Sequence, residues 1–380
     1  MVATDSYAGG DGRLSPLSTP SATRAVLEAH GIGTKYTLGQ NFLVNDDVLK
    51  KIIALAEVGE DDRILEVGPG IGTLTIALLK HAAGVVAIER DPDLPAVLAD
   101  TLHPWREKFA LIEKDALDVT RDDIVAAMVE IGGDTGYPDR ASSAANETAQ
   151  WAVSQSEDCL SESGYPVAPP QEDLQLSLPS KLVANLPYAV AATVVLDYFE
   201  SFPFLDSATI MVQKEVADRM AAAVGTKNYG AYTVKLGLYA EPVGRFAVGP
   251  GNFFPPPRVD SAVIRLNRRV PLMADGAPAS PEVIAAAALM ADAAFTNRRK
   301  TIANSCKTYF SGRGPILLGV ADSSAAEGAP TIALPDGAAT AERLPAIFDA
   351  AAIDSRRRGE TLTQQEFLAL GAALLKVTAA

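Results

Sequence analysis

The sequence is poor in the residues that build disulfide frameworks and metal clusters. Its 380 residues include two cysteines, Cys159 and Cys306, and three histidines, His30, His81 and His103, which are far apart in the chain. Two cysteines cannot make a disulfide framework, and scattered histidines predict no metal site. No apolar run approaches the roughly 18–20 residues needed to cross a bilayer, and the first residues have no apolar core of the kind a signal peptide needs. We therefore expect a cytoplasmic protein without a metal or a membrane partner.

Positive charge is also scarce: 33 Lys and Arg stand against 47 Asp and Glu, for a net charge of −14. That balance argues at first against nucleic acid as a partner, because its phosphates are neutralised by Lys and Arg. The charge is unevenly distributed, however. Residues 130–173 hold nine acids and one base, whereas residues 241–307 hold five acids and nine bases. Local charge is the informative quantity, and the second region could meet phosphates.

Short apolar runs alternate with helical periodicity along the middle of the chain, which predicts a doubly wound, mostly parallel α/β sheet. The expected strands are Arg63–Val67, Val85–Glu89, Ala110–Lys114, Leu182–Ala184 and Thr209–Val212. The expected helices between them are Thr73–Lys80, Leu94–Leu102, Arg121–Ile131 and Ala191–Phe199, and Asn45 is a plausible N-cap of an earlier one. Two later runs, Val243–Val248 and Ser261–Asn267, predict an antiparallel pair at one edge of the sheet.

Segments without periodicity divide the chain. Residues 1–22 are rich in Ser, Thr, Gly and Pro and predict a disordered tail. Residues 132–179 are acidic and too long for an ordinary loop, so we expect a flexible insertion that projects from the surface. Residues 319–340 resemble a second insertion.

The end of the chain predicts a separate unit. Residues 271–281 resemble a linker, and helical patterns follow at Val283–Phe295 and Phe367–Leu375. We expect a main domain over residues 23–270 and a small all-helical domain over residues 276–380.

Polar groups follow three of the expected strands. The glycine-rich turn Glu66–Gly72 follows the first strand, Glu89 ends the second and Asp115 follows the third. Glycines allow a ligand close to the backbone, and a carboxylate at a strand end can accept both hydroxyls of a ribose. Each feature alone could be a tight turn or a solvated strand end, and the turn and Glu89 also fit a dinucleotide. Together they predict a nucleoside site at the carboxyl edge of the sheet, where Asp115 is suited to bind an adenine amino group.

The fourth strand ends in Asn185-Leu186-Pro187-Tyr188. The exocyclic amine of adenine is a poor nucleophile, and it becomes reactive if two acceptors hold its hydrogens. The Asn185 side-chain carbonyl and the Leu186 backbone carbonyl could do so, with Pro187 restricting Leu186 to extended geometry. Tyr188 could stack on the base. Standing alone, this tetrapeptide would be an ordinary strand-to-loop turn.

Taken together, these motifs resemble the bacterial small-subunit (16S) ribosomal RNA adenine dimethyltransferases, the KsgA/RsmA family. The resemblance runs from about Val26 to about Leu375, with the two insertions as departures. Besides the features above it includes Gly39–Leu43, Val212–Ala217, Asn228–Gly230, Phe253–Ser261 and Phe295–Thr301. It implies a Rossmann-like class I methyltransferase fold and S-adenosylmethionine as the methyl donor. The implied substrate is 16S rRNA in the immature small ribosomal subunit, dimethylated at two adjacent adenosines near its 3′ end, and we expect a monomer.

The resemblance also implies roles for individual residues. Asn41, Leu43, Gly68, Glu89, Asp115 and Asn185 would bind S-adenosylmethionine. Phe253 would stack on the target adenine opposite Tyr188, although by itself it reads as a core residue. Arg258 and the cluster Arg298, Arg299 and Lys300 would meet RNA phosphates, although such a run is by default a solvated helix face.

Three other functions remain open on the sequence alone. A large-subunit resistance methyltransferase would use the same chemistry on another RNA, but the Phe253–Ser261 and Phe295–Thr301 segments favour the small-subunit enzyme. A non-catalytic assembly factor would not need an intact Asn185–Tyr188. A nicotinamide dehydrogenase would leave that tetrapeptide and Phe253 without a role.

Overall fold

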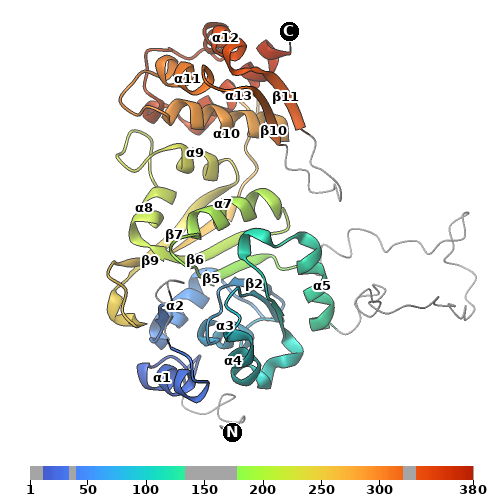
Figure 1. Ribbon diagram of the computed structural model, residues 1–380, viewed down its shortest axis with the longest axis vertical. Coiled ribbons are helices and arrows are strands. Elements are labelled where there is room, and N and C mark those ends of the chain that lie inside the picture. Colours follow the sequence, from blue (N-terminus) through green and yellow to red (C-terminus); the bar gives the residue numbers. More distant parts are fainter. Residues whose placement is uncertain (1–11, 34–39, 133–177, 320–330, 380) are drawn as a thin grey trace, which may run out of the picture.

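A computed structural model describes residues 12–33, 40–132, 178–319 and 331–379 of the chain. Its centre is a seven-stranded sheet in the order β4-β3-β2-β5-β6-β9-β7 (Figure 1). The strands in that order are β4 (Phe109–Ile112), β3 (Gly84–Ile88), β2 (Arg63–Val67), β5 (Lys181–Asn185), β6 (Ser207–Gln213), β9 (Ser261–Arg268) and β7 (Ala240–Val248). The first five are parallel, and β9 pairs antiparallel with β6 and with β7. The predicted parallel sheet and its antiparallel edge are confirmed.

Helices cover both faces of this sheet, as a parallel sheet requires. The helices are α1 (Pro20–Ala29), α2 (Asp46–Ala56), α3 (Thr73–Leu79), α4 (Leu94–Thr101), α5 (Arg121–Gly132), α7 (Ala191–Ser201), α8 (Lys214–Met220) and α9 (Ala231–Gly237). Successive strand residues point to opposite faces: Ile64 packs with α2, α3 and α4, whereas Leu65 packs with α5 and α7. Asn45 caps α2 as predicted, accepting hydrogen bonds from the backbone of Asp47 and Val48.

The start of the described chain corrects the prediction of a disordered tail over residues 1–22. Residues 12–22 are folded, Leu17 is buried, and α1 begins at Pro20 behind its cap Thr19. The backbone N–H groups of Leu14 and Ser15 donate to Asp46 Oδ1 at 2.8 and 3.2 Å. A polar composition reads as disorder, but here the polar groups cap helices. Residues 1–11 lie outside the described chain.

The C-terminal part is helical, as predicted, and also contains a β hairpin that the sequence analysis missed. Its helices are α10 (Pro281–Phe295), α11 (Ile302–Phe310), α12 (Gly337–Ala350) and α13 (Gln364–Thr378), and its hairpin pairs β10 (Pro315–Gly319) with β11 (Thr331–Asp336). Within the predicted insertion over residues 319–340, residues 331–340 form β11 and the start of α12 rather than an irregular segment, and residues 320–330 lie outside the described chain. Of the acidic insertion at 132–179, residues 133–177 also lie outside it. No helix in the described segments is long and apolar enough to cross a membrane.

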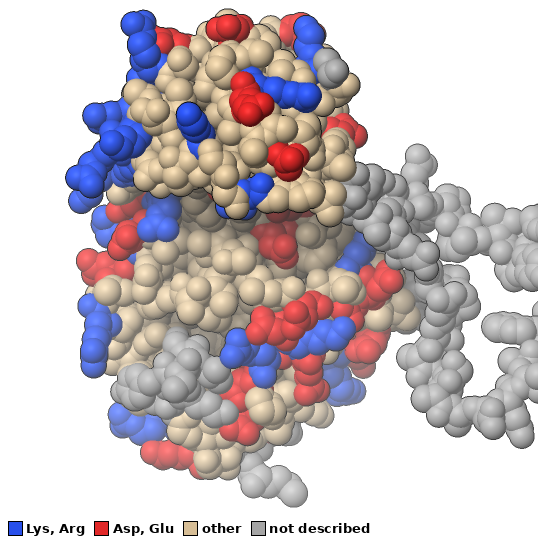
Figure 2. Space-filling view, turned by 45° about the horizontal axis from the view of Figure 1, so that its top comes forward, with Lys and Arg blue, Asp and Glu red and all other residues tan. Residues whose placement is uncertain are grey.

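The C-terminal part is packed against the main domain through α9 (Figure 1). Tyr229, just before α9, and Val234, on α9, belong to the same buried cluster as residues of α10–α13. Lys235 Nζ on α9 lies 3.1 Å from Asp292 Oδ1 on α10. Figure 2 shows Lys and Arg side chains gathered along one side of the C-terminal part, at the left of the view. The shared core fixes this basic side relative to the sheet.

The contact between α10 and α13 depends on Gly371. A Cβ at this position would lie 2.6 Å from the backbone N of Ala287 and 2.6 Å from the carbonyl O of Val283. Both are backbone atoms, which cannot move aside as the end of a flexible side chain could. Gly371→Ala is therefore expected to lower the free energy of unfolding by about 1–3 kcal/mol, despite the better helix propensity of Ala. Urea unfolding measures this, with Gly312→Ala, where nothing lies within 4 Å, as the control. Equal stability of the two variants would contradict this packing.

Candidate functional site

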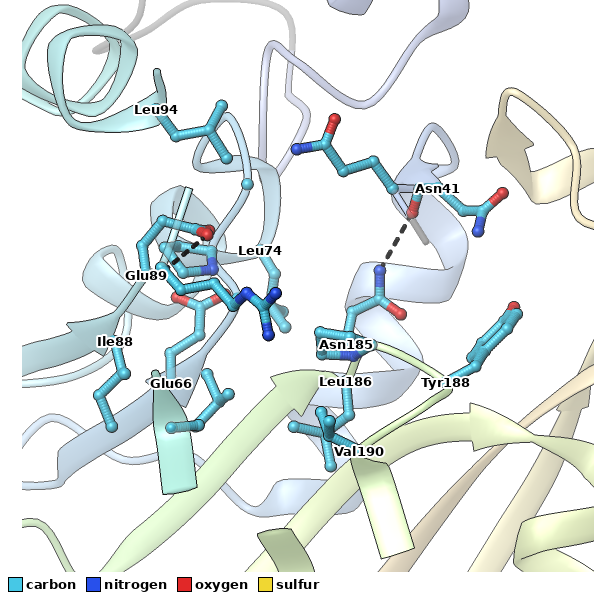
Figure 3. Close-up of a pocket in the computed structure, with 18 of the residues that line it drawn as sticks. Asn41, Glu66, Leu74, Ile88, Glu89, Leu94, Asn185, Leu186, Tyr188 and Val190 are labelled. Atoms are coloured by element: carbon cyan, nitrogen blue, oxygen red, sulfur yellow. Dashed lines mark hydrogen bonds between the residues drawn. The ribbon is translucent and has the colours of Figure 1, made fainter. Parts of the chain in front are cut away.

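A cavity of about 590 Å³ opens at the carboxyl ends of β2, β3, β4, β5 and β6. Among its lining residues are eight of those named from the sequence: Asn41, Leu43, Gly68, Glu89, Asp115, Asn185, Leu186 and Tyr188. Figure 3 shows Glu89 on one side of this cavity, Tyr188 on the other and Asn185 between them. Open α/β sheets bind ligands at this edge because each parallel strand ends there.

The glycine-rich turn leaves the backbone of the cavity floor uncovered. Gly68, Gly70 and Gly72 have φ of 71°, 61° and 88°, the left-handed region that other residues rarely adopt. A Cβ at Gly70 would lie 3.2 Å from the Phe42 ring. The turn therefore needs glycine both for its conformation and for its close approach to the segment that contains Phe42.

Glu89 and Asp115 lie at the ends of neighbouring strands. Glu89 is 8% exposed, and its Oε1 accepts hydrogen bonds from the backbone N–H groups of Arg90 and Asp91 at 3.0 and 2.9 Å. Burial raises the pKa of Glu89, while these N–H groups oppose the rise. Asp115 accepts from Leu117 N at 3.1 Å through Oδ1 and from Arg90 at 2.9 Å through Oδ2. Both carboxylates are thus oriented by the backbone at the cavity wall.

Glu66 is a buried acid of this cavity that the sequence analysis quoted but gave no role. It is 1% exposed, and its Oε2 has no hydrogen-bond partner among the described residues. Burial raises the pKa of Glu66 to about 8, and the nearby charge of Glu89 adds to the rise. A ligand with hydrogen-bond donors or positive charge would satisfy this oxygen.

Asn185 is oriented by the segment that crosses the cavity before α2. Its Nδ2 donates to the Asn41 carbonyl at 3.2 Å (Figure 3). Because a carbonyl only accepts hydrogen bonds, the Asn185 Oδ1 is left as an acceptor. The backbone N–H of Leu186 donates to Met211 O at 3.1 Å, and no described residue donates to the Leu186 carbonyl. Two acceptors therefore stand at adjacent positions of the chain.

Tyr188 is anchored through its hydroxyl group. The Tyr188 hydroxyl lies 2.7 Å from Ser261 Oγ, and Ser261 is fully buried at the start of β9. Partial burial raises the pKa of Tyr188. The bond joins the Asn185–Tyr188 tetrapeptide to the last residue of the Phe253–Ser261 motif and fixes the position of the ring at the cavity edge.

Phe253 is buried and is not among the residues that line the cavity. The structure does not place its ring in the cavity: Phe253 is 4% exposed and pairs with Leu43 in the two-stranded ladder of β1 (Phe42–Leu43) and β8 (Phe253–Phe254). It belongs to the core cluster that contains α2 and α3. Phe253 is therefore buried, as its side chain alone predicts, and its stack on the target adenine stays a prediction.

The basic residues predicted to meet RNA lie outside the cavity. Arg258 is exposed after β8, and Arg299 and Lys300 are exposed in the turn between α10 and α11 rather than on a helix face. Arg298 is partly committed within the fold, since its Nε lies 2.8 Å from Glu360 Oε2.

Sequence reasoning missed two groups of residues. Arg356 and Arg358 are exposed on a segment joined to the Arg299–Lys300 turn by the hydrogen bond from Ile302 N to Arg357 O, and their run of three arginines was the available signal. Arg90 and Gln213 line the cavity. Gln213 lies in the Val212–Ala217 motif, which gave it no role, and no sequence pattern marked Arg90. In the described ranges no cluster of three or more His, Cys, Asp and Glu could hold a metal ion.

Comparison with known families gives one assignment. Residues 33–329 match the family model described as ribosomal RNA adenine dimethylase. The chain is 32% identical over 361 residues to "Ribosomal RNA small subunit methyltransferase A" of Geobacillus sp. (strain WCH70), covering 95% of this chain and 98% of the relative. The protein of that name from Staphylococcus aureus (strain Newman) is 31% identical over 355 residues, covering 93% of this chain and 94% of the relative.

Solved structures share the fold. A dimethyladenosine transferase from Plasmodium falciparum superimposes with a TM-score of 0.55 and 20% identity, covering 88% of this chain and 98% of that one. The 23S rRNA methyltransferase ErmE gives a TM-score of 0.50 and 20% identity, covering 88% of this chain and 99% of that one. At this identity the likeness establishes the architecture alone.

The buried Glu66 predicts a pH-dependent loss of stability. Between the unfolded pKa near 4.5 and the folded value of about 8, the folded protein holds a proton that the unfolded chain releases, so stability falls as pH rises through this window. Each pH unit corresponds to about 1.4 kcal/mol. The free energy of unfolding of Glu66→Gln should therefore rise by up to about 3 kcal/mol relative to that of the wild type between roughly pH 5.5 and pH 8. Urea unfolding without ligand measures this difference. The control Glu215→Gln, at a side chain 79% exposed, should show no such trend. If the stability difference between Glu66→Gln and the wild type did not change with pH, the raised pKa of Glu66 would be contradicted.

Proposed function

Because this chain belongs to the ribosomal RNA adenine dimethylase family, we propose that it dimethylates the 6-amino group of adenosines in 16S rRNA with S-adenosylmethionine as the methyl donor. The relatives at 31–32% identity, named as small-subunit rRNA methyltransferases, support this substrate. ErmE, named as a 23S rRNA methyltransferase, shares only 20% identity. The targets we propose are two adjacent adenosines near the 3′ end, in the immature small subunit of the cytoplasm.

The cavity fits S-adenosylmethionine by its donor and acceptor pattern. The buried Glu66 Oε2 has no partner among the described residues, and the ligand's ammonium and hydroxyl groups are donors. Glu89 is placed to accept from ribose hydroxyls, and Asp115 to accept from the adenine amine. Asn41, Leu43 and Gly68 would contribute the remaining contacts from the segment before α2 and the glycine turn.

The chain's own residues would activate the target amine. When bound, S-adenosylmethionine supplies a methyl group on a positively charged sulfur, so the nucleophile needs no strong base. Asn185 Oδ1 and the Leu186 carbonyl would accept the two amine hydrogens and favour a pyramidal nitrogen with its lone pair available. The orientation of Asn185 by the Asn41 carbonyl is the single observation that carries this proposal, since it leaves Asn185 Oδ1 as an acceptor at the cavity.

Tyr188 would hold the base by stacking. A flipped base on an aromatic ring gains roughly 1–3 kcal/mol, and the 2.7 Å bond to Ser261 keeps this ring from turning. Phe253 would stack on the other face of the base, as the resemblance implies.

The RNA outside the pocket would be bound electrostatically. We propose that Arg258, Arg299 and Lys300, joined by Arg356 and Arg358, neutralise phosphates. Arg298 would add to them only with the part of its guanidinium that Glu360 leaves available. We also propose that the protein acts as a monomer.

Transfer is tested with tritiated S-adenosylmethionine and small ribosomal subunits that lack the modification. Asn185→Ala should lower kcat about 100-fold or more, as the loss of one preorganised polar group at a reacting centre does. Affinity for the RNA particle and the thermal unfolding midpoint should be unchanged. The control Asn304→Ala, exposed on α11, should retain full activity.

Each other outcome has a definite meaning. Retained turnover in Asn185→Ala would refute its role. Label found only in large-subunit RNA would replace the proposed substrate, and binding of wild-type protein without any label would indicate an assembly factor rather than an enzyme.

A further inference from the structure

Gln213 is a polar residue of the cavity that takes no part in the proposed binding of S-adenosylmethionine or activation of the amine. It is the last residue of β6, directly before α8, and its side chain is half-buried at the cavity wall. No described residue hydrogen-bonds its side-chain amide, and it makes no side-chain cap for the helix that follows it. A structural reason for an amide at this position is therefore missing within the described chain.

The strand register places Gln213 next to the ring of Tyr188. Gln213 pairs with Ser261 in the antiparallel ladder of β6 and β9, and directly opposed side chains lie on the same face of a sheet, roughly 5 Å apart at Cβ. Ser261 Oγ is the atom bonded to the Tyr188 hydroxyl. Gln213 thus lies at the hydroxyl end of the ring on which the base would stack.

The same strand also places Gln213 relative to Asn185, where the amine would lie. Asn185 pairs with Met211 in the ladder of β5 and β6, so Gln213 is two residues further along the neighbouring strand, on the same face as Met211. An adenine stacked on Tyr188 with its amine at Asn185 would therefore present an edge to Gln213. The amide NH₂ is a donor, and the ring nitrogens of adenine are acceptors.

We propose that Gln213 positions the target base by donating a hydrogen bond from its side-chain amide to a ring nitrogen of the adenine. The inference rests on the proposed function and extends it to the recognition of the base. A neutral amide suits this role because a carboxylate of the same shape has no hydrogen to donate and would repel the ring-nitrogen lone pair.

The test compares Gln213→Ala and Gln213→Glu with the wild type in the transfer assay on small subunits. Both variants should lower kcat/KM about 10-fold, and Gln213→Glu should not recover activity despite its matching shape. The dissociation constant for S-adenosylmethionine and the thermal unfolding midpoint should stay at wild-type values. The control Glu215→Gln, two residues away on α8 and exposed, should be fully active.

Particles reconstituted with a synthetic 3′ RNA fragment identify the partner atom. The target adenosine is replaced by 1-deazaadenosine in one preparation and by 7-deazaadenosine in another. With the analogue that removes the bonded nitrogen, wild type and Gln213→Ala should be equally slow, so the two losses do not add. Full activity of Gln213→Ala on adenosine, or additive losses with both analogues, would overturn the proposal while leaving the proposed function intact. Failure of the wild-type protein to label any RNA would instead refute the proposed function, and this inference with it.

Discussion

The hydrogen bond from Asn185 Nδ2 to the Asn41 carbonyl is the contact on which the site depends. It ties the end of β5 to the segment that crosses the cavity, and that segment is held on its other side by Gln40, whose Nε2 donates to Asp91 Oδ2 at 2.7 Å. The ladder of Phe42 with Phe254 continues it. One short segment therefore closes the nucleoside cavity and orients the amide at the proposed reaction centre, so binding and activation are coupled through a single piece of backbone.

The second constraint is electrostatic. Glu66, Glu89 and Asp91 are each less than 10% exposed at the ends of β2 and β3, and burying carboxylates without compensation is costly. Backbone N–H groups compensate Glu89, whereas Glu66 is left to hold a proton. Stability is thus reduced at the place where a ligand rich in donors would restore it, as is usual for sites whose groups are arranged for binding rather than for folding.

Much of the fold followed from local patterns in the sequence. The five parallel strands, the edge pair β7–β9 and the helices between them were predicted within a few residues, because apolar periodicity reports directly which face of each element is buried. Glu89, Asp115 and Asn185 were placed at one edge for the same topological reason, since parallel strands all end there. Two differences, in residues 12–22 and 331–340, came from composition: polar and small residues that suggested loops instead cap helices and form a strand.

What only the tertiary structure decided are the contacts between segments far apart in the chain. The burial of Phe253 depends on its pairing with Leu43, 210 residues earlier. The place of Gln213 beside Tyr188 depends on the register of β6 against β9, and the grouping of Arg356 with Lys300 on the packing of α11. The sequence by itself determined the elements, their order and the chemistry of their ends. The partners of each side chain were set by packing between elements, which no local pattern encodes.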